Sequence, residues 1–172
     1  MTNGTNDSAG LRELLRIPDF RRLWFAQIIS DMGDNLTFVT LLFLVQRLTG
    51  STVALAGLAI SVAIPSLVFG LISGVYVDRW DRRKVMIVSN VLQGVVVLGL
   101  VWIRSADLIW LIYLIAFTHA ALETLFFPAK NALLPHLVGK DNLPAANSIS
   151  PTSEIIFNLV GTAIAGLLAG FL

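Results

Sequence analysis

Two long apolar runs flank the stretch Gly74-Val-Tyr-Val-Asp-Arg-Trp-Asp-Arg-Arg-Lys84. This stretch carries four of the chain's 12 Lys and Arg residues. A compact charged turn between two such runs is typical of a short loop that joins two membrane-crossing helices. Loops rich in Lys and Arg stay on the cytoplasmic side, so we expect this loop to lie in the cytoplasm.

The composition indicates a membrane protein. Of the 172 residues, 56% are hydrophobic and only 13% are charged. A soluble domain carries about 25% charged residues, so most of this surface is expected to face lipid. The basic residues cluster beside the apolar runs rather than along one face, which argues against nucleic acid as a partner. The absence of cysteine excludes disulfides, thiolate metal sites and thiol nucleophiles.

Five apolar segments are long enough to cross a bilayer, which takes about 20 residues. We expect a cytoplasmic tail with a short interfacial helix over residues 1–19 and a membrane bundle over residues 20–172. The predicted spans are about 23–46, 53–77, 85–103, 108–129 and 143–172. The fold class is therefore all-α, with every predicted element a helix.

The charges at the ends of these spans predict their orientation. Of the 12 Lys and Arg residues, only Arg47 and Arg104 flank the predicted outer ends, which leaves ten at the inner ends. The positive-inside rule then places the N-terminus in the cytoplasm. We expect a multi-pass protein of the cell membrane, with the bacterial inner membrane as its compartment. Because the sequence ends inside an apolar run, we expect it to be a fragment or truncated product of a longer protein.

Four acidic residues fall inside the predicted spans, namely Asp31, Asp34, Glu123 and Glu154. A charged side chain at the bilayer centre costs about 2.5–3.5 kcal/mol on insertion scales. These residues should therefore face the bundle interior or a water-filled cavity. At about 100° per residue, Gln27 shares a helix face with the first two acids.

Helical phase also groups polar residues on the later spans. His119, Glu123 and Lys130 fall on one stripe of the fourth span, and Glu154 and Asn158 align on the fifth. The third span holds few such groups. We therefore expect the first, fourth and fifth spans to line a polar interior and the third to face mostly lipid.

Each polar group also has a structural alternative. His119 and Glu123, four residues apart, could bind a metal, form a static hydrogen-bonded pair, or carry a proton or substrate. Two ligands make half a metal site and no third is apparent, so we expect no metal and no cofactor. Hydroxyls of a neighbouring helix could satisfy Asp34. The candidate proton or substrate groups are Gln27, Asp31, Asp34, His119, Glu123, Glu154 and Asn158.

The second span combines small residues with a proline. Ser66, Gly70 and Gly74 recur every four residues, a spacing that we expect to allow a neighbouring helix to approach closely. Pro65 is expected to kink this helix.

Two stretches resemble transporters of the major facilitator superfamily. The opening stretch is similar to the loop between their second and third helices. The segment Phe127-Pro-Ala-Lys-Asn-Ala-Leu-Leu-Pro-His-Leu-Val-Gly-Lys-Asp-Asn-Leu-Pro-Ala-Ala-Asn-Ser-Ile149 resembles their helix 4–5 junction in the branch that includes the enterobactin exporter and macrolide efflux pumps. The resemblance covers about residues 18–170. It implies a twelve-helix transporter of two six-helix halves, of which this chain supplies the N-terminal five helices.

The resemblance also implies roles for the charged loop. In the family, the residues corresponding to Asp78 and Arg79 help to latch the two halves on the cytoplasmic side. The full latch motif is Gly74, Asp78, Arg79, Arg82, Arg83 and Lys84. The second glycine of the family motif is Asp81 here. Antiporters of the superfamily tend to carry Gly-Pro on helix 5, where this chain has Gly161-Thr162.

The leading hypothesis is secondary active efflux of small molecules by alternating access, driven by proton antiport. Its partners would be the lipid bilayer, a small-molecule substrate, protons and the missing C-terminal half of the transporter. The alternative is a truncated membrane remnant or scaffold that transports nothing. No His-Glu-x-x-His, Gly-x-Ser-x-Gly or paired catalytic Asp motif stands in the spans, so we do not expect an enzyme.

Overall fold

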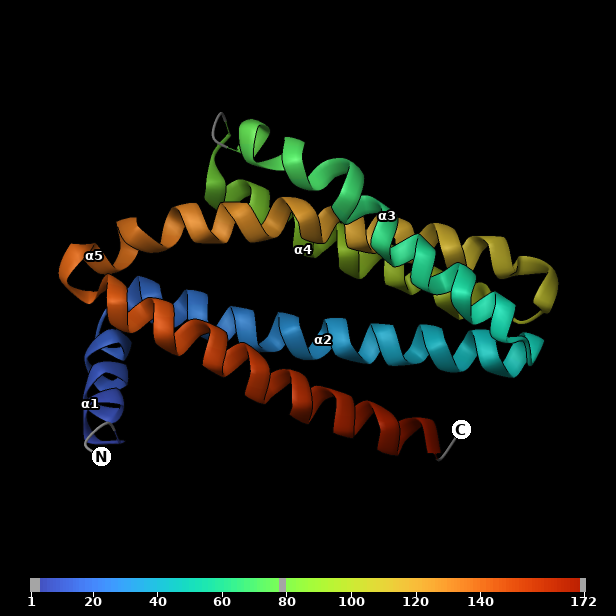
Figure 1. Cartoon of the computed structure of the whole chain (residues 1–172), viewed down its shortest axis with the longest axis horizontal. Coiled ribbons are helices and arrows are strands. Elements are labelled where there is room, and N and C mark those ends of the chain that lie inside the picture. The colour runs from blue at the N-terminus through green and yellow to red at the C-terminus, as the bar shows by residue number, and fades with distance from the viewer. Residues whose placement is uncertain (1–3, 78–79, 171–172) are drawn as a thin grey trace. The chain divides into compact units, whose positions relative to one another are not determined.

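The computed structural model describes residues 4–77 and 80–170, which form helices joined by short turns (Figure 1). The elements are α1 (Gly4–Leu15), α2 (Pro18–Thr49), α3 (Thr52–Val77), α4 (Arg82–Leu98) and α5 (Ile109–Gly170), with short 3-10 helices at Gly99–Trp102 and Ala106–Leu108. No strand occurs in this part of the chain. The prediction of an all-α protein is confirmed.

Among the described residues, four helical segments are long and apolar enough to cross a membrane. They are Pro18–Thr49, Thr52–Gly70, Arg82–Trp102 and Ala106–Leu168. The last has 63 residues, and one crossing takes about 20 residues. It is therefore long enough to contain both the fourth and the fifth predicted span.

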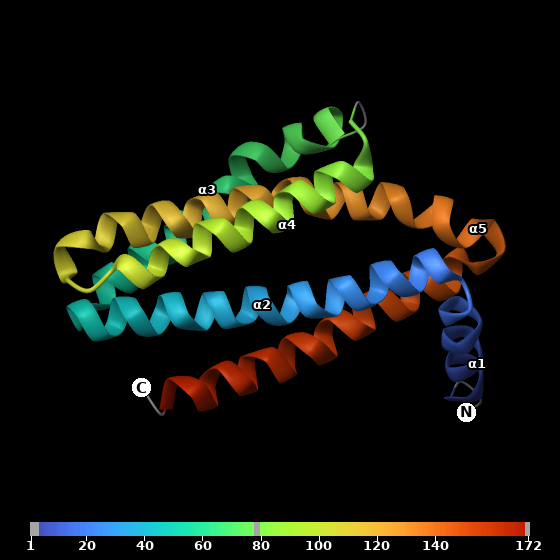
Figure 2. The same ribbon diagram turned by 180° about the vertical axis from the view of Figure 1, so that it is seen from behind.

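The predicted connection between those two spans, residues 130–142, is helical apart from Gly139. This glycine has φ 75° and ψ 173° inside α5. A positive φ is open to glycine and strained for residues with a Cβ, so the break falls at the one glycine of the segment. The orange part of α5 turns in both views (Figure 1, Figure 2). The helix therefore continues on both sides of a single-residue break between the fourth and the fifth predicted span.

The charged turn before α4 is organised by Asp81. Its carboxylate accepts hydrogen bonds from the main-chain N–H groups of Arg83 at 3.0 Å and Lys84 at 3.2 Å. The first N–H groups of a helix have no partner within the helix, and an N-cap side chain supplies one. Asp81 therefore fixes the residue at which α4 begins.

The chain divides into two compact units, and each is described by itself. Unit 1 comprises Met1–Leu36 and Ala132–Leu172, and unit 2 comprises Thr37–Asn131. The core of unit 1 joins α1, the start of α2 and the turn of α5. Its buried residues are Leu14, Phe20, Leu134, Val138 and Ala146.

The core of unit 2 joins the end of α2 with α3, α4 and the first part of α5. Its buried residues are Leu41, Val45, Leu58, Ile103, Ile112, Ile115 and Ala116. At one close contact, Oη of Tyr113 donates to the main-chain oxygen of Ala54 at 3.0 Å. Many large apolar side chains point outward, such as Leu67 on α3 and Val91 on α4. An apolar exterior of this kind suits a surface that faces lipid.

Candidate functional site

Polar side chains on α2 form a hydrogen-bonded chain in unit 1. Nε2 of Gln27 donates to Oδ1 of Asp31 at 2.6 Å, and Nδ2 of Asn35 donates to the main-chain oxygen of Asp31 at 2.7 Å. These residues follow one another at intervals of four, which places them on one helix face. The structure therefore brings together Gln27 and Asp31, which sequence phase had grouped.

Asn35 extends this chain to α5. Its Nδ2 lies 2.6 Å from Oδ1 of Asn158, and Oγ1 of Thr162 donates to its Oδ1 at 3.1 Å. Close by, a Cβ added to Gly161 would lie 3.2 Å from Cβ of Asn35, so the helices meet tightly at this point. Asn158 was among the predicted candidates. Asn35 and Thr162 were not, although their four-residue spacing from Asp31 and Asn158 was a usable signal.

A second polar contact joins the same two helices. Nε1 of Trp24 donates to Oγ of Ser153 at 3.1 Å, and the ring of Trp24 meets that of Phe157 edge-on at 6.4 Å. The candidates Asp34 and Glu154 also belong to unit 1, and both are half-buried. Trp24 and Asn35 thus each join α2 to α5 by a polar contact.

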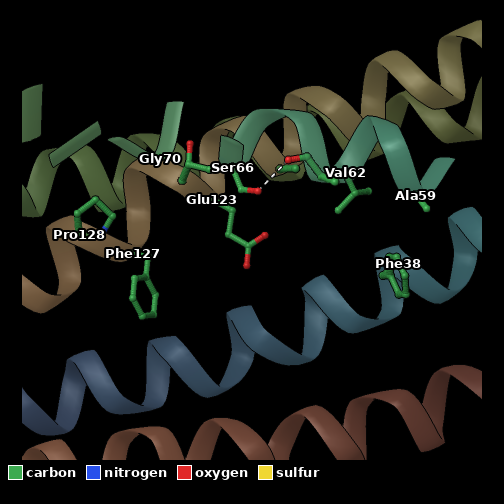
Figure 3. Close-up of a pocket in the computed structure, with 11 residues that line it drawn as sticks. Phe38, Ala59, Val62, Ser66, Gly70, Glu123, Phe127 and Pro128 are labelled. Atoms are coloured by element: carbon green, nitrogen blue, oxygen red, sulfur yellow. Dashed lines mark hydrogen bonds between the residues drawn. The ribbon is translucent and has the colours of Figure 1, made fainter. Parts of the chain in front are cut away.

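Unit 2 contains a cavity of about 690 Å³ between α2, α3 and α5. Glu123 is the one charged residue among the described residues that line it, and Figure 3 shows its side chain extending away from α5 between its neighbours. The lining residues are Phe38, Ala59, Val62, Ala63, Ser66, Gly70, Ala120, Glu123, Thr124, Phe127 and Pro128. A mainly apolar cavity with a few polar groups is typical of a small-molecule site.

The small residues of α3 serve this cavity. Ser66 and Gly70 line it, and a Cβ added to Gly70 would meet no atom within 4 Å. No neighbouring helix therefore approaches closely at Gly70, contrary to the prediction, whereas the predicted packing role of Ser66 stays a prediction. Their small side chains leave room for the cavity instead.

His119, Glu123 and Lys130, which helical phase placed on one face, do not all line the cavity. His119 is 9% exposed and is not among the cavity-lining residues. Lys130 is 7% exposed, and its Nζ lies 5.2 Å from the centroid of the Phe127 ring. A cation over an aromatic face is an attractive arrangement. Glu123 alone of the three lines the cavity.

α4 carries polar groups that sequence reasoning missed. Ser89 and Gln93, four residues apart, are buried, and Nε2 of Gln93 donates to the main-chain oxygen of His119 at 3.4 Å. Large apolar residues such as Val91 and Val95 occupy the exposed side. α4 therefore presents lipid-compatible side chains on one face and packs a polar face against α5. The signal in the sequence was the pair Ser89 and Gln93, two polar residues four positions apart within an apolar run.

The latch motif is described only in part. Asp78 and Arg79 lie outside the described residues, and Gly74 lies in α3. Arg82, Arg83 and Lys84 are the first three residues of α4, and the Asp81 side chain caps the N–H groups of the last two. Among the side chains that the structure describes, residues 10–70 and 80–168, no three of His, Cys, Asp or Glu gather in a way that could hold a metal ion.

The chain was also compared with known proteins. The family of transmembrane secretion effectors, one of the major facilitator superfamily (MFS), matches residues 12–172. The chain belongs to this family. The resemblance to MFS transporters is therefore confirmed. Because four helices in the described part of the chain are long and apolar enough to cross a membrane, it is a multi-pass membrane protein.

Some relatives of the chain are named as exporters. It is 30% identical to the uncharacterized MFS-type transporter YfiS of Bacillus subtilis over 148 residues. This alignment covers 85% of the chain and 35% of YfiS. It is 28% identical over 151 residues to macrolide efflux protein A of Streptococcus pyogenes, an alignment that covers 87% of the chain and 37% of that protein. It is 29% identical over 154 residues to the enterobactin exporter EntS of Shigella boydii, an alignment that covers 88% of the chain and 37% of EntS.

The chain spans little more than a third of the length of these curated relatives. No solved structure matches it.

Proposed function

We propose that this chain is the front part of a transporter that exports small amphipathic molecules by alternating access. The cavity in unit 2 carries the proposal. Its volume of about 690 Å³ lies within the range of about 300–1,000 Å³ that is usual for small-molecule sites. Relatives whose printed names describe efflux and export support the outward direction.

In this proposal, export is coupled to inward proton flow through Glu123. A carboxylate in the cavity can hold either a proton or a substrate, and such competition is the basis of antiport. Coupling also requires that the proton favours one conformation over the other, because a ligand shifts an equilibrium only by its differential affinity. Asp31, whose carboxylate accepts from Gln27, and Asp34 are the alternative proton carriers.

The remaining parts of the proposal concern the whole transporter. The N-terminus lies in the cytoplasm and the bundle in the bacterial inner membrane. A C-terminal half supplies the opposite wall of the transport path. Asp78 and Arg79 contact that half as a cytoplasmic latch, because an acid at a helix end can meet the positive N-terminus of a helix opposite.

Export by the full-length transporter in liposomes with an imposed pH gradient tests this proposal. Glu123→Gln should abolish gradient-driven export, because the amide cannot take up and release a proton at this position. Glu13→Gln, an exposed position on α1, is the matched control and should leave export intact. Asp31→Asn and Asp34→Asn identify the proton carrier if Glu123→Gln still exports.

Two outcomes would overturn the proposal. Unchanged gradient-driven export in all three variants would remove these acids from the coupling. Absence of transport by the full-length protein and by the 172-residue chain would favour the membrane remnant or scaffold.

A further inference from the structure

We propose that one uncovered face of α2 in unit 1 binds a single anionic phospholipid. The face begins with two arginines near the start of the helix and continues with apolar and small residues. Its occupant must therefore carry a negative charge at one end and an apolar chain behind it, which is the build of such a lipid. This binding needs no transport activity.

The exposed residues of α2 in unit 1 follow helical spacing from Arg21 onward. They are Arg21, Arg22, Phe25, Ala26, Ile29 and Gly33. Residues at these intervals lie on one side of a helix. Phe25 is 51% exposed and Ile29 is 72% exposed, so the described residues leave this side largely uncovered. We call these six residues the α2 strip.

The α2 strip is about as long as one leaflet of a bilayer. Arg21 and Gly33 lie about 18 Å apart along the helix axis, and half of the hydrocarbon core is about 15 Å. A Cβ added to Gly33 would meet no atom within 4 Å, so there is open space at the far end of the strip. A lipid phosphate beside the arginines would thus leave its acyl chain along the apolar part of the strip.

The two arginines of the α2 strip have little to hold them within the described part of the chain. Arg21 makes no ion pair there, and Arg22 pairs with Asp19 at 3.3 Å. The side chains of this pair are 75% and 66% exposed, and an ion pair so open to solvent contributes little to stability. Guanidinium groups bind phosphate through two parallel hydrogen bonds, so a lipid phosphate is the stronger partner.

α1 adds positive charge near the same end of α2. It lies across the start of α2 in both views, and Leu14 holds its inner side in the core of unit 1 (Figure 1, Figure 2). Arg12 on α1 and Arg16 in the following turn are exposed, and the exposed Glu13 offsets one of these charges. Arginines at a membrane surface attract anionic headgroups. A zwitterionic lipid has no net charge and gains less from them.

Trp24 can report on the occupant, because its ring centroid lies 5.1 Å from that of Phe25. Trp80→Phe, Trp102→Phe and Trp110→Phe together leave it as the one tryptophan of the chain. The purified chain is reconstituted in phosphatidylcholine vesicles with increasing amounts of phosphatidylglycerol or phosphatidylcholine that carries brominated acyl chains. Bromine quenches tryptophan fluorescence only at short range. We expect brominated phosphatidylglycerol to quench Trp24 at a mole fraction at least about tenfold lower than brominated phosphatidylcholine.

Matched variants assign this preference to the α2 strip. Arg21→Gln combined with Arg22→Gln should remove it, whereas Arg21→Lys combined with Arg22→Lys should keep most of it. Arg47→Gln, at an exposed position near the other end of α2, should leave it unchanged. High salt should weaken the preference, because it screens exposed charges. Circular dichroism shows whether each variant has folded, and the salt and lysine comparisons decide the matter if the glutamine pair does not fold.

Four results would overturn this proposal. Equal quenching by the two lipids would exclude selection for an anionic headgroup, and no quenching by either would show that protein covers the α2 strip. A preference that survives in the glutamine pair would place the lipid elsewhere. Displacement of phosphatidylglycerol by soluble glycerol phosphate would indicate a site for free phosphate instead of a lipid. None of these results bears on export, so a failure here leaves the proposed function standing.

Discussion

The amides of Asn35 on α2 and Asn158 on α5 are joined directly, with Nδ2 of Asn35 2.6 Å from Oδ1 of Asn158. The same nitrogen donates to the main-chain oxygen of Asp31, and Oδ1 of Asn35 accepts from Thr162. Both the donor and the acceptor side of the Asn35 amide are thus engaged. We infer that this residue holds the two helices of unit 1 together.

Asn35→Ala and Asn158→Ala should each lower the free energy of unfolding by about 1 kcal/mol, because hydrogen bonds between membrane helices contribute about 0.6 and at most about 1.7 kcal/mol. The two effects should not add, since either change removes the shared bond. Unfolding of the purified chain by denaturing detergent measures both the single and the double variant. Asn147→Ala, at an exposed position of α5, is the control. Strictly additive losses would show that the two amides do not interact.

Gly161→Ala should destabilise unit 1, whereas Gly166→Ala should not. A Cβ on Gly161 would lie 3.3 Å from Cα of Met32 and 3.2 Å from Cβ of Asn35, whereas one on Gly166 would meet nothing within 4 Å. Overpacking at such a contact costs about 1–3 kcal/mol. Thermal unfolding of the two variants compares them at the same substitution. Equal melting temperatures would show that α2 and α5 are not in tight contact at Gly161.

The sequence predicted the elements better than their joints. Apolar length alone located the helices, because a bilayer demands about 20 apolar residues for each crossing. The predicted spans did not show that the chain breaks at the single residue Gly139 between them, because its φ and ψ are known only from the structure. The role of Asp81 was also hidden, since a cap is recognised only when the first residue of the helix is known.

Asp81→Ala should shorten or destabilise the start of α4 by about 1 kcal/mol, the usual loss for an N-cap acceptor. Asp81→Gly should cost only a few tenths of a kcal/mol, because glycine is tolerated at N-caps. This difference explains how a family motif with glycine at this position can accept aspartate. Asp81→Asn keeps an acceptor and serves as the control. The free energies of unfolding of the three variants test this ranking. If Asp81→Ala is as stable as Asp81→Asn, the Asp81 side chain does not cap α4.

The sequence predicted which acidic residues belong to the candidate site, but not which residues of other helices lie next to them. The cost of an acid in hydrocarbon singled out Glu123 and Asp31 without any structure. Phase along one helix grouped Gln27 with Asp31, but it could not show that Asn35 reaches Asn158 on α5 or that Glu123 lines the cavity and His119 does not. Those relationships depend on which helices are neighbours.

Asn90→Leu should stabilise the chain by about 1 kcal/mol. Oδ1 of Asn90 on α4 is buried and has no hydrogen-bond partner among the described residues. A buried acceptor without a donor costs about 1–3 kcal/mol, and an apolar side chain of similar volume removes that cost.

Gln93→Leu, one turn further along α4, is the matched comparison and should have the opposite sign. It removes the donor that reaches the main-chain oxygen of His119 on α5, a loss of about 0.6 kcal/mol for an average bond between membrane helices. Detergent-induced unfolding of the two variants measures the contrast. If Asn90→Leu destabilises as much as Gln93→Leu, Oδ1 of Asn90 has a donor in the membrane-embedded protein, and the polar face of α4 contributes to stability along its whole length.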